Sequence, residues 1–181
     1  MGEFKTPAPV LLIAGLIANP AEGFERARTA LESEFGPVEV ESPVWDFDFT
    51  DYYAGEMGAD LKRQFVAFEG LRPLDGLHRA KITANAIEAR IAADSAAGVP
   101  RPVNIDPGYV CSAKLVLFSS KDFSHRLYAG DGVFAESTLE WHGREFATHP
   151  WTFPDYRTEN YRNFFRDLRV MYGRKLRQLD G

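Results

Sequence analysis

The first half of the chain alternates short apolar runs with amphipathic stretches. Residues 8–18 form the most apolar run, which is typical of a strand that is covered on both faces. Asn19 and Pro20 then provide a helix N-cap and a first helical residue. Apolar side chains follow at three- and four-residue steps, and they predict one buried helix face made of Phe24, Ala27, Leu31 and Phe35.

Three further strands and a second helix complete this half. Residues 38–49, 61–69 and 103–105 have the composition of strands. Between the last two of these, a helix is predicted by an apolar stripe made of Leu77, Ala80, Ala84, Ile87 and Ile91. The order β-α-β-β-α-β over residues 8–106 predicts an α+β fold, a ferredoxin-like sandwich with its helices on one face of the sheet.

The second half, residues 107–181, is rich in strands and ends in a helix. Residues 115–119 are apolar, and residues 126–141 predict a hairpin that turns at Gly130-Asp131-Gly132. A short strand is expected around Phe146, and a long helix is expected to begin near Thr158. The apolar face of that helix is made of Tyr161, Phe164, Phe165, Leu168, Met171, Tyr172, Leu176 and Leu179. We therefore expect a single domain over residues 1–181, in which the hairpin and the long helix extend the ferredoxin-like part.

Composition narrows the class of protein. The chain has 181 residues, of which 45% are hydrophobic, and no apolar run is long enough to cross a bilayer. Residues 8–18 do not resemble a secretion signal, because Glu3 beside Lys5 leaves no positively charged segment before them. The single cysteine, Cys111, excludes a disulfide within the chain. These features predict a cytoplasmic protein with no membrane partner.

Charge is distributed unevenly along the chain. Residues 22–60 contain eleven acidic side chains against only Arg26 and Arg28, whereas the final helix is rich in arginine. The two regions either complement each other within one fold or pair between subunits, which leaves a homo-oligomer as one expectation. The formal net charge of −5 argues against nucleic acid as a partner.

Paired carboxylates lie on the strand predicted at residues 38–49. Asp46 and Asp48 alternate with Phe47 and Phe49, and Asp51 comes where the strand should end. Carboxylate oxygens are the ligands that Mg²⁺ prefers. The pattern is equally typical of the solvent face of an edge strand, so both interpretations stay open.

The motif at residues 104–109 combines a turn with an acid. Pro107 and Gly108 suit the central positions of a type II turn, with Asp106 before them and Tyr109 after them. Asp106 would then lie just beyond the carboxyl end of a strand, where open α/β sheets often place their sites. Asp106 is therefore a candidate both for catalysis and for metal binding, and Tyr109 is a candidate for ligand binding.

Residues 121–126 gather a proton carrier and two cations. His125 can transfer a proton near neutral pH, while Lys121 and Arg126 can bind a phosphate or a carboxylate. The alternative is a structural hydrogen-bonding pair beside a hairpin. Glu136, on the facing hairpin strand, has the phase of a solvent-facing glutamate and is the fourth candidate metal ligand, after Asp48, Asp51 and Asp106.

The aromatic segment at residues 149–156 is predicted to be extended, because its prolines disfavour helix. Trp151 could stack on a base or a sugar, with Asp155 beside it, or the segment could cover the core. Known sequence motifs give no support for nucleotide binding. Residues 130–135 match G-x-G-x-x-A but precede a strand and not a helix, and no phosphate loop of the G-x-x-x-x-G-K-[S/T] type occurs.

Five segments together resemble the domain of unknown function 4416 family. They are Asp48-Phe49-Thr50-Asp51-Tyr52-Tyr53 and residues 104–109, 121–126, 132–136 and 151–156. The resemblance implies a stand-alone, single-domain microbial protein with no established activity. Some relatives carry the label of GTP-binding protein, which is not carried over because the phosphate loop is missing. The resemblance also implies one shared polar site formed by Asp48, Asp51, Asp106, Lys121, His125, Arg126, Glu136 and Asp155.

Two hypotheses follow. In the first, the protein binds a phosphorylated or nucleotide-like small molecule or performs metal-assisted chemistry on it. The carboxylates would hold a divalent cation such as Mg²⁺, Lys121 and Arg126 would bind phosphate, and His125 would transfer protons. In the second, the protein is not an enzyme and self-associates through its acidic and basic faces.

Overall fold

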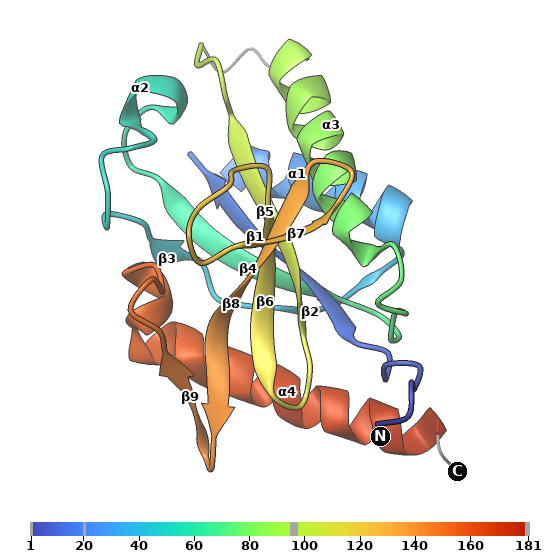
Figure 1. Ribbon diagram of the computed structural model, residues 1–181. Coiled ribbons are helices and arrows are strands. Elements are labelled where there is room, and N and C mark those ends of the chain that lie inside the picture. Colours follow the sequence, from blue (N-terminus) through green and yellow to red (C-terminus); the bar gives the residue numbers. More distant parts are fainter. Residues whose placement is uncertain (1, 20, 95–97, 180–181) are drawn as a thin grey trace.

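A computed structural model describes residues 2–19, 21–94 and 98–179 of the chain (Figure 1). The fold is α+β, with one large antiparallel sheet and helices packed on it. The strands are β1 (Leu11–Ala18), β2 (Val38–Glu41), β3 (Trp45–Asp46), β4 (Lys62–Phe68), β5 (Val103–Val110), β6 (Lys114–Ser119), β7 (Leu127–Gly130), β8 (Val133–His142) and β9 (Glu145–Thr148). The helices are α1 (Ala21–Phe35), α2 (Ala54–Met57), α3 (Ala80–Ala93) and α4 (Glu159–Leu179), with single 3-10 turns η1 (Leu77–Arg79) and η2 (Asp155–Arg157).

Strands from both halves of the chain belong to one sheet. Their order is β2-β4-β1-β5-β6-β8-β7, with β3 also paired to β4 and β9 also paired to β8. Strand β1 lies inside the sheet and pairs antiparallel with β4 and β5. All eight of its residues are buried, which confirms the strand predicted from the apolar run. The expected hairpin therefore does not stand apart from the first half, because β6 joins it to β5.

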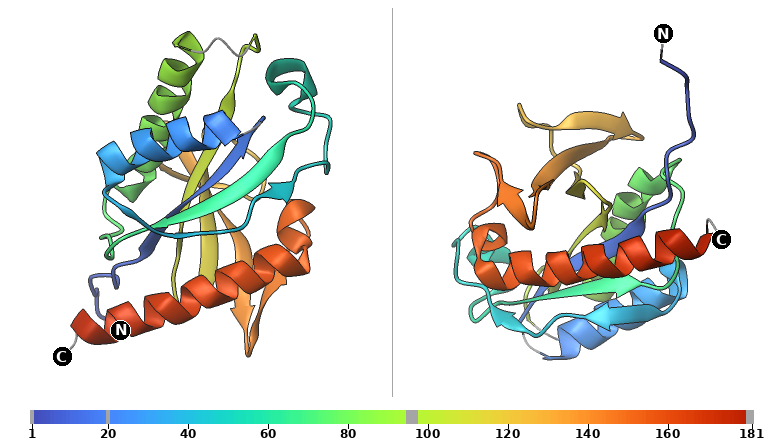
Figure 2. Two further views of the ribbon diagram at one scale, coloured as in Figure 1. Left: turned by 180° about the vertical axis from the view of Figure 1, so that it is seen from behind. Right: turned by 90° about the horizontal axis from the view of Figure 1, so that it is seen from below.

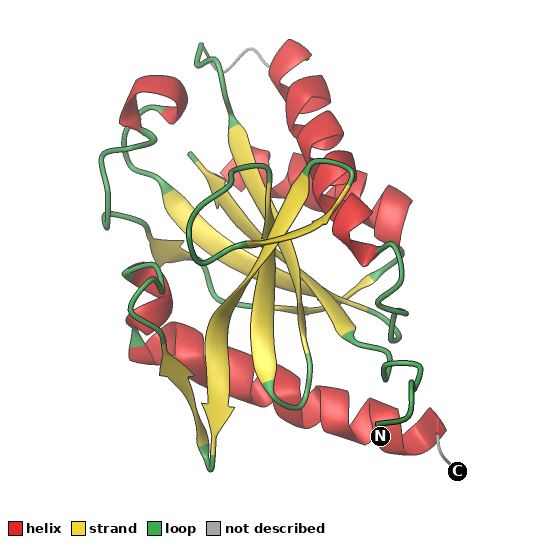
Figure 3. Cartoon of the chain, viewed as in Figure 1, coloured by secondary structure: helices red, strands yellow, loops and turns green. Residues whose placement is uncertain are grey.

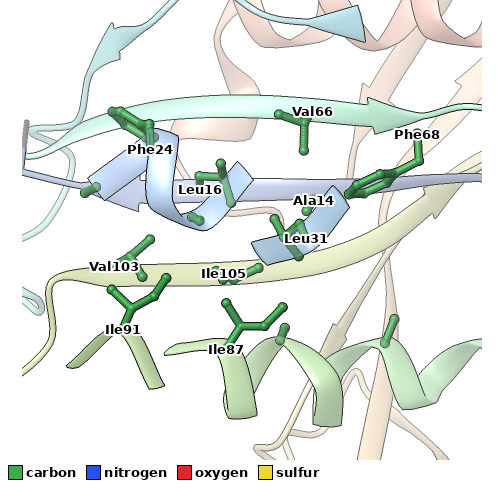
Figure 4. Packing of buried hydrophobic residues seen from close by; sticks show 14 of the residues in the cluster. Ala14, Leu16, Phe24, Leu31, Val66, Phe68, Ile87, Ile91, Val103 and Ile105 are labelled. Carbon is green, nitrogen blue, oxygen red and sulfur yellow. The ribbon is translucent and has the colours of Figure 1, made fainter. Parts of the chain in front are cut away.

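Helices cover both faces of the sheet (Figure 2). On one face, α1 and α3 pack on alternate residues of β1, among them Leu12. Figure 4 shows two others, Ala14 and Leu16. On the other face, α4 packs on Leu11 and Ile13. Successive side chains of a strand point to opposite faces, so an apolar run is needed where both faces are covered. The expectation of helices on one face holds for α1 and α3, and α4 adds a third layer.

Several local predictions are confirmed. The hairpin turns at Gly130-Asp131-Gly132, where all three residues have positive φ. Strand β9 surrounds Phe146, and α4 begins directly after Thr158. The predicted apolar faces of α1 and α3 pack into the core, and so does that of α4 except for Leu179, which is exposed. The cap predicted at Asn19-Pro20 includes Pro20, which lies outside the described residues.

Two local predictions are wrong. The strand expected at residues 38–49 is two short strands, because its pairing with β4 is irregular at Val38–Val40 and breaks before Trp45. The type II turn expected around Pro107-Gly108 is absent, because β5 continues from Val103 to Val110. The sequence signal of a turn was overruled by pairing with β1 along the whole of β5.

Strand β5 tolerates this proline because one of its edges is partly open. Strand β6 pairs with β5 only at residues 108–110, so the ladder on that side has not begun at Pro107. At Ile105, side chains of α3 replace the missing strand. Lys81 Nζ donates to the Ile105 carbonyl at 2.7 Å, and the Ile105 N–H donates to Glu88 Oε1 at 2.7 Å.

In the part of the chain that the structure describes, no helix combines the length and the apolar character that a membrane crossing requires.

Gly108 provides a test of how β5 and β6 join. A Cβ atom at this position would lie 2.1 Å from the Val116 carbonyl oxygen, which is backbone and cannot rotate away. We expect Gly108→Ala to lower the free energy of unfolding by about 2 kcal/mol or more, measured by urea denaturation. Gly55→Ala is the matched control, because a Cβ there meets nothing within 4 Å. Equal stability of the two variants would contradict the described pairing.

Candidate functional site

A cavity of about 640 Å³ opens where β5 and β6 separate. Its walls come from the segment from Phe47 to Tyr53, α3, β5, the end of β6 with its following loop, and the segment from Phe153 to Tyr156. Arg63 of β4, Arg101 and Glu136 of β8 also line it. The loop between β6 and β7 passes in front of the sheet in Figure 3. Five cationic side chains, four carboxylates and eight aromatic rings line the cavity. It is therefore both charged and strongly aromatic.

The floor of the cavity is built around Arg63 of β4. This side chain is buried, and its guanidinium donates to Asp155 Oδ2 at 3.0 Å and to Asp106 Oδ2 at 3.5 Å. Its central carbon lies 5.0 Å from the ring centre of Phe47 and 5.6 Å from that of Tyr156. Buried arginine is tolerated only where its charge is paired, and here two acids and an aromatic cage provide the pairing.

A glycine in β1 makes room for this guanidinium. A Cβ atom at Gly15 would lie 2.9 Å from Arg63 Nη1. In the sheet, Gly15 is directly opposite Asp106 of β5. The missing side chain therefore allows Arg63 to reach across β1 and pair with Asp106.

Two acids on the floor have shifted pKa values in opposite directions. Burial alone would raise the pKa of Asp106, but the charges of Lys81 and Arg63 and a hydrogen bond from Asn104 outweigh it, and the net pKa is lowered. Asp106 is therefore ionised at neutral pH. The pKa of Asp155 is raised, because its burial outweighs the attraction of Arg63.

One end of the floor continues onto α3. Lys81 Nζ lies 3.6 Å from Asp106 Oδ1 and 4.0 Å from Glu88 Oε1. Arg101 donates from Nε and Nη2 to Glu88 Oε2 at 3.1 and 2.8 Å. Tyr53 packs nearby, with Arg101 6.0 Å from its ring centre. Burial, together with the charge of Asp106, raises the pKa of Tyr53 to about 12, so this phenol is neutral and able to donate.

The mouth of the cavity has a second cluster. Arg126 Nε donates to Glu136 Oε2 at 2.7 Å, and its Nη1 donates to Ser119 Oγ at 2.7 Å. Lys121 has no carboxylate within ion-pair distance among the described residues. It donates to the Tyr52 hydroxyl at 2.5 Å and lies 4.6 Å from the centre of that ring. Lys121 is exposed, so its charge is available to an incoming ligand.

His125 is held outside the cavity wall. Its Nε2 lies 3.1 Å from Glu136 Oε2, and its ring is stacked between Phe123 and Trp151, whose centres are 6.1 and 5.5 Å away. His149 stacks on the other side of Trp151 at 4.7 Å. His125 therefore supports Glu136 from behind, while Phe123 itself lines the cavity.

The structure brings together five of the predicted site residues. The cavity wall contains Asp106, Lys121, Arg126, Glu136 and Asp155. Glu136 was expected to face solvent, but it is buried because it pairs with Arg126 and His125.

Four other predicted residues lie elsewhere. Trp151 belongs to the stack on His125, and its indole N–H donates to the Ser137 carbonyl at 3.0 Å. Tyr109 is three positions from Asp106 on β5, so its side chain points to the opposite face of the sheet. Asp48 and Asp51 are exposed and do not line the cavity.

The four-carboxylate metal site is not formed. Within residues 2–19, 21–94 and 98–179, no group of three or more His, Cys, Asp or Glu side chains is arranged to hold a metal ion. Asp106 is already paired with Arg63 and Lys81, and Glu136 is paired with Arg126. Binding of a divalent cation remains a prediction that this geometry does not support.

Sequence reasoning missed Arg63, Lys81, Glu88 and Arg101. A signal for Arg63 was present, because it has the same strand phase as Phe65 and Ala67, whose side chains are buried. A charged residue in a buried phase needs a partner, and such a residue marks a polar site. Lys81 and Glu88 are seven positions apart on α3 and so lie on one face, although nothing local indicated that they would meet β5.

Removing the charge of Arg63 tests the floor of the cavity. Arg63→Met leaves Asp155 buried without its cation, and we expect a loss of about 3–5 kcal/mol in the free energy of unfolding at pH 7. The loss should shrink as the pH falls toward 5. Without Arg63, burial raises the pKa of Asp155 unopposed, and protonation then stabilises the folded variant.

The measurement is chemical denaturation of both proteins between pH 5 and 8. Arg79→Met is the control, because Arg79 pairs with Asp131 on the surface and should contribute less than about 1 kcal/mol. A loss for Arg63→Met that does not vary with pH would mean that Asp155 does not depend on Arg63.

Comparison with known proteins identifies a family but no activity. No curated protein matches the chain. The family model described as "Domain of unknown function (DUF4416)" matches residues 8–172, which include every described strand and the part of α4 up to Tyr172. The chain therefore belongs to the domain of unknown function 4416 family.

Proposed function

We propose that the protein binds a phosphorylated or nucleotide-like small molecule in the cavity between β5 and β6. The observation that carries this proposal is the distribution of charge. On the floor, three cations face three carboxylates: Arg63, Lys81 and Arg101 against Asp106, Asp155 and Glu88. At the mouth, Lys121 and Arg126 face Glu136 alone. The floor is therefore neutral, and the excess positive charge lies at the mouth.

This distribution suits a ligand with an anionic end and a neutral end. A phosphate at the mouth would meet Lys121 and the Ser119 hydroxyl, and it would stay close to solvent. The neutral part would enter between aromatic rings such as Phe47, Phe118 and Tyr156, which favour a planar group. The volume lies within the range of about 300–1,000 Å³ that is common for small-molecule sites.

The same geometry supports binding more directly than catalysis. His125, the expected proton carrier, does not line the cavity and is stacked between two rings. Asp106 lines the cavity as an ionised acid, so it is suited to accept hydrogen bonds. Proton transfer by either group, and a Mg²⁺ ion carried in with the phosphate, stay predictions.

Ligand titration of a lysine variant tests the proposal. The wild-type protein is titrated by calorimetry with nucleoside monophosphates, sugar phosphates and inorganic phosphate, each with and without Mg²⁺. We expect at least one organic phosphate to bind. We also expect Lys121→Ala to weaken it by about tenfold or more, because a charge-assisted hydrogen bond is lost.

Lys114→Ala is the matched control, since Lys114 lies exposed on β6 and does not line the cavity. Affinity unchanged in Lys121→Ala, or no binding of any phosphorylated compound by the wild-type protein, would contradict the proposal.

A second candidate function is self-association, and α4 provides the observation that favours it. Arg166, Val170, Arg174 and Arg177 form one exposed stripe along this helix. Between the acidic region and α4, the ion pair found among the described residues is Lys175–Glu39, at 2.6 Å. Arg166 lies 3.8 Å from Asp167, whereas Arg174 and Arg177 have no ion-pair partner among the described residues and remain for an acidic surface on a second copy.

Sedimentation at two salt concentrations tests this second candidate. We expect a dimer at 50 mM salt that dissociates at 500 mM, because charge pairing is screened by salt. Arg174→Glu with Arg177→Glu should give a monomer at 50 mM salt as well, because the charges that pair with the acidic surface are reversed. A monomer at every salt concentration would contradict self-association.

We further propose that the part from β1 to β5 is a ferredoxin-like unit, as the sequence suggested for residues 8–106. Its support is the antiparallel strand order β2-β4-β1-β5, with α1 and α3 together on one face. A single domain and a cytoplasmic location stay predictions.

A further inference from the structure

One acid of the cavity stands apart from the others. The side chain of Asp106 is 27% exposed, whereas those of Glu88, Asp155 and Glu136 are 11%, 4% and 1% exposed. All four line the cavity, but Asp106 presents the most surface to a ligand.

One carboxylate oxygen of Asp106 is also free to accept a hydrogen bond from a ligand. Oδ2 receives hydrogen bonds from Asn104 Nδ2 at 2.7 Å and from Arg63 Nη1 at 3.5 Å. Oδ1 has Lys81 Nζ at 3.6 Å, which is too long for a hydrogen bond. The lowered pKa keeps the group ionised, and an ionised carboxylate accepts hydrogen bonds but cannot donate them.

Aromatic rings line the cavity around the cationic partner of this acceptor. Phe47 and Tyr156 flank the neighbouring Arg63, and Tyr53 is close enough for the charge of Asp106 to act on its phenol. A planar heterocycle that packs against these rings would direct one edge at Asp106. An amino group on that edge would donate to Oδ1, whereas a carbonyl oxygen there would be repelled.

We infer that the cavity selects a nucleotide whose base carries an exocyclic amino group, with Asp106 accepting the amino N–H and the phosphate at Lys121. The inference rests on the proposed function. It specifies how the ligand is oriented in the cavity, with the base on the floor and the phosphate at the mouth. The neutral balance of the floor agrees with an uncharged base there. Lys121, which has no ion-pair partner among the described residues, agrees with an anion at the other end.

Matched nucleotide pairs test the inference in the wild-type protein. CMP and UMP differ in an amino group against an oxo group, and in the neighbouring ring nitrogen, which accepts a hydrogen bond in CMP and carries a proton in UMP. AMP and IMP differ in the same two ways. We expect the amino member of each pair to bind about tenfold tighter in calorimetric titrations, because the Asp106 carboxylate loses a hydrogen bond when it faces a carbonyl oxygen. Equal affinities within both pairs would overturn the inference and leave the proposed function standing.

Two variants test which side chain produces the selectivity for the amino group. In Asp106→Asn, the new amide can donate a hydrogen bond as well as accept one. The ratio of the two affinities within each pair should therefore fall toward one. Its folding is checked by circular dichroism, and the wild-type ratios remain decisive if it fails to fold. Lys121→Ala should weaken all four nucleotides alike and leave the ratios unchanged. If the affinity ratios are preserved in folded Asp106→Asn, another group recognises the base.

The failures of the two proposals are distinguishable. Binding of sugar phosphates without binding of any nucleotide would overturn the inference alone. Absence of binding by every phosphorylated compound would overturn both.

Discussion

The buried guanidinium of Arg63 is the constraint on which the rest of the structure depends. It lies on the central part of the sheet under several rings, where an unpaired charge would be very costly. Its pairing therefore fixes three distant parts of the chain: Gly15, which leaves it room, Asp106 on β5, and Asp155 on η2. Because η2 directly precedes α4, the same ion pair connects the floor of the cavity to the helix that covers this face of the sheet.

The cavity itself results from an incomplete sheet. Strands β5 and β6 pair over three residues and then separate, which would leave the backbone of Ile105 without partners. Lys81 and Glu88 fill these positions from α3, so the gap is stable without a closing strand. The walls of the gap then carry the charged and aromatic side chains on which the proposed function rests. In this way a gap in the ladder forms the candidate binding site.

The sequence predicted the parts of the fold that depend on local patterns. The apolar run of β1, the helical faces of α1 and α3 and the glycine-rich hairpin turn each follow from spacing that a single segment contains. Pro107-Gly108 shows the limit, because this turn signal lies inside a strand that long-range pairing keeps extended. The site was predicted in part, since Asp106, Lys121, Arg126, Glu136 and Asp155 do meet at one cavity. Arg63, Lys81 and Arg101 were missed because their importance comes from partners far away in the chain, and Asp48 and Asp51 were included because alternation along a strand was assumed where the chain forms a loop.

The central claim is that one cavity holds a phosphorylated ligand with its anionic end at the mouth. The most direct measurement is a crystal structure of the protein with a bound nucleoside monophosphate. The account predicts the phosphate within hydrogen-bond distance of Lys121 and the base among the rings beside Asp106. A nucleotide bound outside the cavity, or one with its phosphate on the floor beside Asp106, would contradict it.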